Sequence, residues 1–424
     1  MYFANIETES YTAEDVLFFI RIKGKQHFFN EIYGKQVMER LFGHINNHHT
    51  ISEYKNAHHH INLDKFSITD LTSSDYEIYY ECIHTEIPSI ITRCRGLREI
   101  SYSEAKELIL LACKFFVDFF DSHKYRLVVI HIIDNYVLDV MYRVAKHKGI
   151  QVLCLSEWVV ENYRRHTIYG ELIPFREPLE DEVIRIASFF QKKEKCFWLR
   201  GVDRFNRIRH TLYLIMRYWI LFISRYLICY RLLGDRSYEY RFAHVWHTKL
   251  RYFFISQYFT KINARFIEAN LQRLIMVPLH YFPEANVDYW MTDYRHSDYY
   301  TSLYEAVSFF RDRGFILIIK EHPFFLYQRD PEVYKRLVKY KNVHLIDPMS
   351  DYAYLLDLVQ MVMVWHGSMG IEALMSGKKV ICFDKNYYSQ DLIPDYRHFE
   401  LAKSLTELEQ QEFIRSLLRG VQEI

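Results

Sequence analysis

Cysteine pairs with the spacing of metal and redox motifs are missing from this sequence. Its seven cysteines stand far apart, and none forms a Cys-x-x-Cys pair. Their number is odd, which does not suit a complete disulfide framework. Reduced thiols in a cytosolic compartment are the simplest interpretation.

The sequence has no excess of charge of either sign. Its 54 Lys and Arg residues nearly balance its 53 Asp and Glu residues. A protein that coats nucleic acid electrostatically would be basic, so we expect no nucleic-acid partner. A small molecule or a local surface is the expected partner.

The N-terminus lacks the basic start and apolar run of a signal peptide. It carries Glu7, Glu9, Glu14 and Asp15 instead. We therefore expect no export and a cytoplasmic location.

An uninterrupted apolar run of membrane-spanning length is also missing. Residues 200–236 hold eight arginines and two acids among Leu, Ile, Phe, Tyr and Trp. Arg217, Arg225 and Arg231 interrupt the apolar stretch, whereas a span needs ~18 to 20 apolar residues. We predict that this segment does not cross a bilayer. It either lies on an anionic membrane surface or forms an ordinary interdomain helix, and the sequence leaves both open.

The first half of the chain predicts alternating strands and helices. We expect a strand at 16–22, a turn at 23–25 and a helix from about 31 to 42. A helix at 103–120, a strand at 127–133, a helix at 136–148 and a strand at 150–155 follow. This βαβ pattern, with Gly149 ending a helix, is typical of a parallel doubly wound sheet.

Residues 44–99 show weak periodicity and contain two histidine clusters, His48-His49 and His58-His59-His60. Adjacent histidines point in different directions on a regular element, and few carboxylates, Asp64 among them, stand nearby. We predict a solvated polar loop and no metal site.

The second half alternates more regularly. Strands are predicted at 274–277, 315–319, 343–346, 361–364 and 380–383, with helices at 297–313, 331–340, 351–357 and 371–376 between them. The fold class is therefore α/β, with two Rossmann-like domains that face each other across a cleft. We predict domains at residues 1–200 and 271–424, joined by a helical linker at 201–270.

One predicted strand end is followed by His366-Gly367-Ser368-Met369-Gly370-Ile371-Glu372. Gly367 and Gly370 allow a close backbone approach, and Ser368 can cap the helix, whose start attracts phosphate. Glu372 is one position too late for a capping box and could accept hydrogen bonds from a ribose diol. The alternative is a Gly-rich turn with a solvated glutamate.

Two further motifs place histidines after strands. In Lys320-Glu321-His322-Pro323, the proline aims His322 into the cleft, where it could stabilise charge on a leaving phosphate. In the stiff segment 278–284, two prolines bracket His280 and precede Glu284. A structural turn and a rigid crossover are the respective alternatives.

Pro-Leu-His-x-x-Pro-Glu at 278–284, Lys-Glu-His-Pro at 320–323, Asp347-Pro348, and Gly-Ser-x-Gly-x-Glu-Ala-Leu-x-x-Gly-Lys at 367–378 occur in this order. In this order they resemble the bacterial capsule polysaccharide biosynthesis family, which includes transferases that add Kdo from CMP-Kdo. The likeness covers about the last 150 residues well and residues 127–157 more loosely.

The resemblance implies a GT-B glycosyltransferase that binds a nucleotide-sugar in its C-terminal domain and a glycan or lipid-linked acceptor in its N-terminal domain. It implies neither a metal nor a cofactor. His322 and Ser368 would contact the donor phosphate and Glu372 the ribose, within a donor site that also includes His280, Glu284, Lys320, Pro323, Gly367 and Gly370. We expect Asp134, or in second place Glu157, to be the catalytic carboxylate, because each follows a strand of the opposing domain.

The expected function is transfer of a sugar, with Kdo as one candidate, to a capsule or other surface polysaccharide. It would act in the cytoplasm, in peripheral contact with the anionic inner face of the cytoplasmic membrane. The alternatives are a polyol-phosphate transferase of the teichoic-acid type and a non-catalytic scaffold of the capsule assembly complex. The segment Leu155-Ser156-Glu157-Trp158 departs from the Gly-rich, acid-rich stretch of Kdo-specific members, so the donor stays open.

Overall fold

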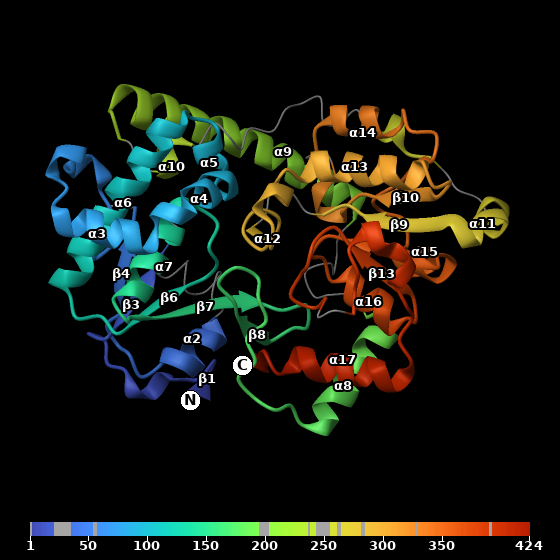
Figure 1. The fold of residues 1–424 in the computed structure, drawn as a ribbon, viewed down its shortest axis with the longest axis horizontal. Helices are drawn as coiled ribbons and strands as arrows, with labels where there is room; N and C mark the ends of the chain where they lie inside the picture. Colours follow the sequence, from blue (N-terminus) through green and yellow to red (C-terminus); the bar gives the residue numbers. More distant parts are fainter. Residues whose placement is uncertain are drawn as a thin grey trace.

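The computed structural model describes residues 2–20, 35–53, 57–194, 203–235, 238–242, 255–260, 264–280, 285–326, 329–389 and 392–424. The predicted turn at 23–25 and the predicted site residue Glu284 lie outside these ranges. Two large sheets, one mixed and one parallel, each covered by helices, organise the chain (Figure 1). The predicted α/β fold with two Rossmann-like halves is confirmed.

The first sheet has seven strands in the order β14-β8-β7-β6-β3-β4-β5. The strands from β7 to β5 are parallel, and β8 and β14 are antiparallel to their neighbours. The bounds are β3 Val16–Phe19, β4 His49–Ser52, β5 His59–His60, β6 Leu127–Ile130, β7 Gln151–Glu157, β8 Tyr163–His166 and β14 Val421–Glu423; the short pair β1 Tyr2–Phe3 and β2 Ile6–Glu7 stands apart.

Helices of the first half pack on this sheet. The side chain of Ser101 caps α6, and that of Asn135 caps α7, so both helices begin where a polar side chain accepts from the first-turn backbone. The bounds are α2 Lys35–Phe42, α3 Ser73–Cys82, α4 Ile87–Arg93, α5 Arg95–Arg98, α6 Tyr102–Ser122 and α7 Tyr136–His147.

The second sheet has five parallel strands in the order β11-β10-β9-β12-β13. Their residues are almost all buried, because helices cover both faces of such a sheet. The strands are β9 Leu274–Pro278, β10 Ile316–Lys320, β11 Val343–Ile346, β12 Met361–Val364 and β13 Lys379–Cys382; the helices are α11 Ala264–Asn270, α12 Ala285–Asp288, α13 Tyr299–Arg311, α14 Pro331–Leu337, α15 Tyr352–Leu358, α16 Met369–Met375 and α17 Glu407–Leu418.

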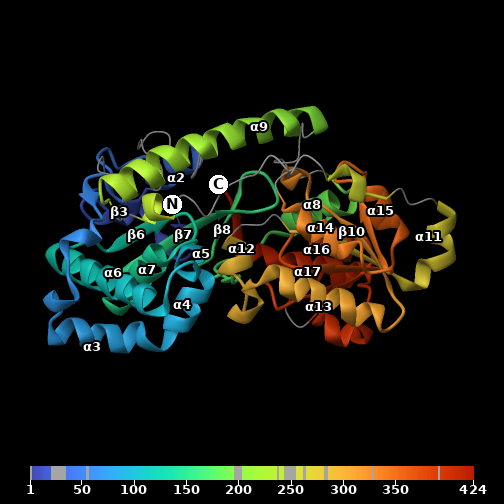
Figure 2. The same cartoon turned by 90° about the horizontal axis from the view of Figure 1, so that it is seen from above.

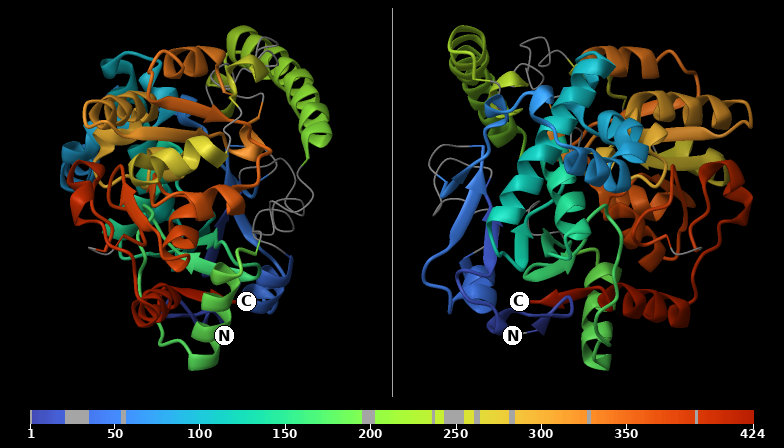
Figure 3. Two further views of the ribbon diagram at one scale, coloured as in Figure 1. Left: turned by 90° about the vertical axis from the view of Figure 1, so that its right-hand side faces the viewer. Right: turned by 60° about the vertical axis from the view of Figure 1, so that its left-hand side comes forward.

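The chain crosses between the two halves more than once. Helix α8 (Glu180–Gln191) packs on α16 and α17 and shares their hydrophobic core. Strand β14 then returns to pair with β8 of the first sheet. The chain ends therefore lie close together (Figure 3), and residues 421–423 complete the sheet of the first half, although the predicted boundary assigns them to the second.

A long helix bridges the two halves on one side of the molecule. It comprises α9 (Arg204–Leu221) and the π-helical η7 (Phe222–Leu232), and α10 (Tyr238–Arg241) follows. Near its start, Ile208 packs on the second core, and beyond its end Phe242 packs on Gly96 in the first core. Figure 2 shows α9 running over both halves.

The prediction of a solvated polar loop for the histidine clusters is wrong. His49 and His59 lie on the short parallel strands β4 and β5, and their ring nitrogens lie 2.9 and 2.7 Å from the Tyr125 hydroxyl. A buried tyrosine that bonds to both rings could not be recognised from local periodicity, because it lies more than sixty residues away.

Candidate active site

A cavity of about 540 Å³ lies between the two halves at the carboxyl ends of parallel strands. The ends of β9, β10 and β12 contribute from the second sheet, and the end of β7 contributes from the first. Ligands bind at this edge in open α/β sheets. Both predicted signature loops, 320–323 and 366–372, contribute to its wall.

A buried ion pair between Glu321 and Arg329 stabilises the loop after β10. Arg329 donates to both oxygens of Glu321, at 2.5 and 3.0 Å, and the Tyr334 hydroxyl donates to the same carboxylate at 2.5 Å. Arg329 also donates to the His280 carbonyl at 2.7 Å. One buried guanidinium therefore fixes the backbones that carry His280 and His322.

The side chains that this arrangement presents to the cavity are His280, Lys320, His322 and Pro323. Lys320 Nζ donates to the Pro348 carbonyl at 2.7 Å, and burial lowers the pKa of this amine to about 8. Burial, with smaller contributions from nearby His280 and Lys320, lowers the pKa of His322 to about 3. His322 is thus a neutral imidazole at physiological pH, so it would act on a phosphate as a hydrogen-bond donor.

The glycine loop brings Gly367, Ser368 and Glu372 to the same cavity. The Ser368 hydroxyl donates to Glu372 Oε1 at 3.1 Å, and burial raises the pKa of this carboxyl. Ser368 occupies the N-cap position of α16 but makes no side-chain cap bond, which corrects its predicted capping role. Its hydroxyl holds the glutamate instead.

Gly370 has a different role from the predicted one. It is not among the residues that line the cavity, and a Cβ built on it would lie 2.3 Å from the Tyr388 hydroxyl. That hydroxyl donates to the Gly367 carbonyl at 2.8 Å. Gly370 therefore makes room for the tyrosine that fixes the loop.

The first half supplies Ser156 and Glu157 at the end of β7, together with His131 and Arg165. Glu157 is a lining residue at the end of β7, and its exposed carboxylate lies 3.5 Å from Arg164, which is not among the lining residues. Asp134 is not among the lining residues. Its charge acts on buried Asp288, which pairs with Arg95 and Arg98.

Arg165 is clamped between two aromatic rings. Its guanidinium carbon lies 4.3 Å from the ring centroids of Trp290 and Tyr387, and its side chain is buried. The arginine comes from β8 and both rings come from the second half, so this stack joins the halves at the cavity wall. Helix α9 adds Arg207 and His210 to the same wall.

Sequence reasoning did not identify Arg165, Arg207, His210 or His366 as site residues. His366 is buried, its Nε2 lies 3.1 Å from Met291 Sδ, and burial holds its pKa well below the usual value. It opens the glycine motif at 366–372, two residues after the end of β12, and this position was an available signal. The two arginines gave no such signal, because the chain has 54 basic residues and neither arginine lies in a motif.

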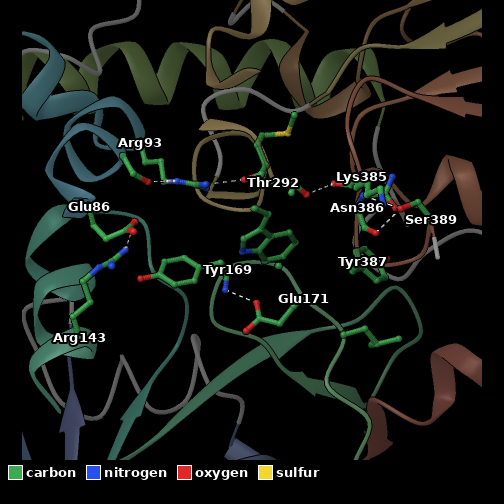
Figure 4. A pocket seen from close by; sticks show the side chains of 15 residues that line it. Glu86, Arg93, Arg143, Tyr169, Glu171, Thr292, Lys385, Asn386, Tyr387 and Ser389 are labelled. Carbon is green, nitrogen blue, oxygen red and sulfur yellow. Dashed lines mark hydrogen bonds and ion pairs between the residues drawn. The ribbon is translucent and has the colours of Figure 1, made fainter. Parts of the chain in front are cut away.

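A second cavity of about 510 Å³ adjoins the first, since Trp290 and Tyr387 line both. Figure 4 shows Glu86, Arg93 and Arg143 from the first half facing Lys385, Asn386 and Ser389 from the second. Tyr169 and Glu171 lie between the two groups. The lining mixes carboxylates, cations, an amide and aromatic rings.

The side chains of the second cavity are held by further bonds. Arg93 donates to the carbonyls of Tyr289 and Met291, at 2.5 and 2.8 Å, and Glu171 accepts from the Tyr169 amide at 2.6 Å. Arg143 donates to Asp139 at 2.8 Å. In the ranges that the structure describes, no group of three or more His, Cys, Asp or Glu residues is arranged to hold a metal.

Comparison with known proteins gives one family. Residues 225–419 match the family described as capsule polysaccharide biosynthesis protein, as the sequence motifs predicted. No curated protein matches the chain.

Several solved structures show a distant likeness. A KpsC beta Kdo 2,7 transferase of Thermosulfurimonas dismutans is 13% identical, with 72% of this chain and 79% of that chain covered and a TM-score of 0.35. The beta Kdo 2,4 transferase of KpsC from the same organism is 14% identical over 71% and 82%, with a TM-score of 0.34. A UDP-GlcNAc 2-epimerase from Methanocaldococcus jannaschii is 11% identical over 96% and 94%, with a TM-score of 0.23.

Proposed function

We propose, because residues 225–419 match the capsule polysaccharide biosynthesis family, that the chain is a glycosyltransferase that uses a nucleotide-sugar donor. It would add a sugar to a capsule or other surface polysaccharide, or to its lipid-linked precursor. CMP-Kdo is one candidate donor, and other CMP-linked or UDP-linked sugars are the alternatives.

The observation that supports this proposal is the meeting of two loops and several cations on one cavity. Lys320, Arg165 and Arg207 line it together with neutral His322. Cations and hydrogen-bond donors attract phosphate, and a buried carboxyl such as Glu372 suits the hydroxyls of a ribose. A nucleotide carries both groups.

In the proposed reaction, an acceptor hydroxyl attacks the anomeric carbon of the donor sugar. Glu157 takes the proton of that hydroxyl as general base, the new glycosidic bond forms, and the bond from the anomeric carbon to the phosphate oxygen breaks. The nucleotide leaves with the bonding electrons. Lys320, Arg165 and the His322 hydrogen bond stabilise the negative charge on its phosphate.

The second cavity is the proposed site of the acceptor sugar. Aromatic rings such as Tyr169 can stack on a sugar ring, and Glu86, Arg143 and Asn386 offer hydrogen-bond partners for its hydroxyls. The shared residues Trp290 and Tyr387 would bring this sugar next to the donor.

The direct test is nucleotide binding, measured as thermal stabilisation with CMP, CDP, UDP and GDP. One of them at a hundred times its dissociation constant should stabilise the folded protein by ~2.7 kcal/mol. In Glu372→Gln the same nucleotide should give at least about a tenfold higher dissociation constant, since a hydrogen bond to a charged group contributes ~1.5–3 kcal/mol.

The matched control is Glu400→Gln, which changes an exposed glutamate far along the chain from both loops. It should bind as wild type does. If no nucleotide stabilises the wild-type protein, or if Glu372→Gln binds as tightly, the donor site is assigned wrongly.

A polyol-phosphate transferase remains the second candidate, because the same cations would hold a phosphate that is transferred with its polyol. Its product would contain phosphorus from the donor, whereas a glycosyltransferase product would not. Phosphorus analysis of the polymer separates the two. A non-catalytic scaffold would bind neither donor.

A further inference from the structure

The bridging helix exposes an unusually apolar surface. Residues Phe205–Leu232 have the length and composition of a membrane span, and only 6% of the most apolar 18-residue window is buried. Exposed large side chains follow one another along it: Leu212, Tyr213, Met216, Trp219, Ile220, Ile223, Leu227 and Ile228. A soluble surface helix would normally be polar on this side.

The opposite face of the first part of the helix packs on the protein. Arg207, Thr211 and Ile215 are buried and recur every four residues, so they form one stripe. Ile208 contacts the second core, and Phe242 beyond the helix contacts the first. The helix is therefore held by its first part, residues 207–215, on the second half, and by the following Phe242 on the first half.

The charged residues of the bridging helix are all basic. Residues 204–234 contain six arginines and no Asp or Glu. Arg209, Arg217 and Arg231 are exposed near the apolar side chains. Apolar residues flanked by arginines match the acyl boundary and the anionic headgroups of a membrane.

We propose that α9 and η7 lie in the plane of an anionic membrane surface, with the stripe of Met216, Ile220 and Ile223 inserted. The helix does not span the bilayer, because its first part, residues 207–215, is packed on the protein and Arg217 and Arg225 fall inside the apolar stretch. The sequence prediction that it does not cross a bilayer stays in place, although its length and composition would permit a span.

This arrangement rests on the proposed function in one respect. Arg207 and His210 of the same helix line the donor cavity, so membrane binding would place that cavity beside the lipid surface. A lipid-linked acceptor could then reach the donor without leaving the membrane. The surface would be the inner face of the cytoplasmic membrane.

The experiment is co-sedimentation of the full chain with vesicles of phosphatidylcholine, with and without phosphatidylglycerol. The wild-type protein should sediment with the anionic vesicles at low salt and should dissociate from them at high salt. The triple variant Met216→Ser, Ile220→Ser, Ile223→Ser and the triple variant Arg217→Gln, Arg225→Gln, Arg231→Gln should each bind at least about tenfold more weakly.

The control triple, Leu179→Ser, Leu401→Ser, Leu408→Ser, removes exposed leucines from elsewhere on the surface and should bind as wild type does. Wild-type binding by both helix variants would overturn the proposal. Release of the bound protein from the vesicles by detergent, but not by salt or alkaline carbonate, would indicate a membrane span and would also overturn the proposal. A dimer that forms without vesicles and buries the helix would do the same.

Nucleotide stabilisation of the wild type is measured in parallel. Vesicle binding without any nucleotide effect would reject the transferase and keep the membrane surface. Nucleotide binding without vesicle binding would keep the proposed transferase and reject the membrane surface.

Discussion

At the scale of single residues, the glycine loop separates two glycines that look equivalent in the sequence. A Cβ on Gly370 would meet the Tyr388 hydroxyl at 2.3 Å, whereas a Cβ on Gly367 would have its nearest neighbour, His280 Nδ1, at 3.8 Å. The first contact is a clash, and the second is ordinary van der Waals contact. The two positions therefore differ in steric tolerance, although both were predicted for close approach to a ligand.

We expect Gly370→Ala to lower the free energy of unfolding by ~1–3 kcal/mol, as overpacking does. Gly367→Ala should change it by less than ~1 kcal/mol, but it places a methyl group on the cavity wall and should weaken nucleotide binding. Urea denaturation measures the first effect and thermal shift the second. Adding Tyr388→Phe to Gly370→Ala should recover part of the loss; a double variant less stable than Gly370→Ala would contradict the proposed clash.

The site residues differ in how far the sequence could predict them. His280, Lys320, His322, Gly367, Ser368 and Glu372 lie in motifs after strands, and the strand-end rule places them on the cavity. The same rule suggested Asp134, but that residue stands four positions beyond β6, and only His131 and Ile132 of its loop reach the cavity. A strand end fixes where a loop begins, and the course of the loop depends on tertiary contacts.

At the scale of elements, the loop after β10 is defined by the residues behind it. Glu321 and Arg329 are both fully buried, and Arg329 also bonds to the His280 carbonyl and, at 3.1 Å, to the Tyr300 hydroxyl. Removing one partner of a buried ion pair leaves the other charge without compensation. The pair thus supports the loop that carries His322 and takes no part in the proposed chemistry.

We expect Arg329→Leu to destabilise the protein by ~3–5 kcal/mol, because it leaves the Glu321 carboxylate buried with only neutral donors. Tyr334→Phe, which removes one of these donors, should cost ~1–2 kcal/mol. Chemical denaturation measures both. Equal losses in the two variants would show that the ion pair contributes no more than one neutral hydrogen bond.

Most elements of the second half were predictable, because buried runs such as Met361–Val364 alternate with helices at regular intervals. Prediction was weaker where strands are short and polar. β4, β5 and β8 contain histidines and arginines, and their burial depends on partners such as Tyr125 and Trp290 that are distant in sequence. Local patterns contain no information about such partners.

At the scale of the whole molecule, the two halves are joined by contacts that could not be predicted from any single segment of the sequence. Helix α8 packs in the second half although it follows the first sheet, and β14 returns across the boundary. Arg95 and Arg98 of α5 pair with buried Asp288, which follows β9. We expect the halves to unfold together, because each contains parts of the other's chain.

Acid should weaken this assembly. Burial lowers the pKa of His322 to about 3, that of His59 to about 4, and that of His366 well below its usual value. In the unfolded chain these imidazoles take up protons near pH ~6.5, but in the folded protein they stay neutral. Between pH ~6.5 and ~4 the unfolded state therefore binds more protons, and the free energy of unfolding falls as the pH falls.

Two buried carboxyls act in the opposite direction, and burial raises the pKa of Glu372 as well as that of Asp288. Burial raises the pKa of Asp288 to about 6, above the usual 3.8, so the folded state takes up this proton first and gains stability as the pH falls through that window. These three histidines, together with His166 and His344, whose pKa burial also lowers, outnumber the two carboxyls, so we expect a net loss on acidification. Thermal melts from pH 7 to pH 4 should show a falling melting temperature. His366→Gln should flatten that dependence, and the exposed control His398→Gln should leave it unchanged. A melting temperature that increases as the pH is lowered from 7 to 4 would contradict the expected net loss. An equal slope in His366→Gln and wild type would mean that His366 is protonated in the folded protein and is therefore open to solvent or paired with an acid.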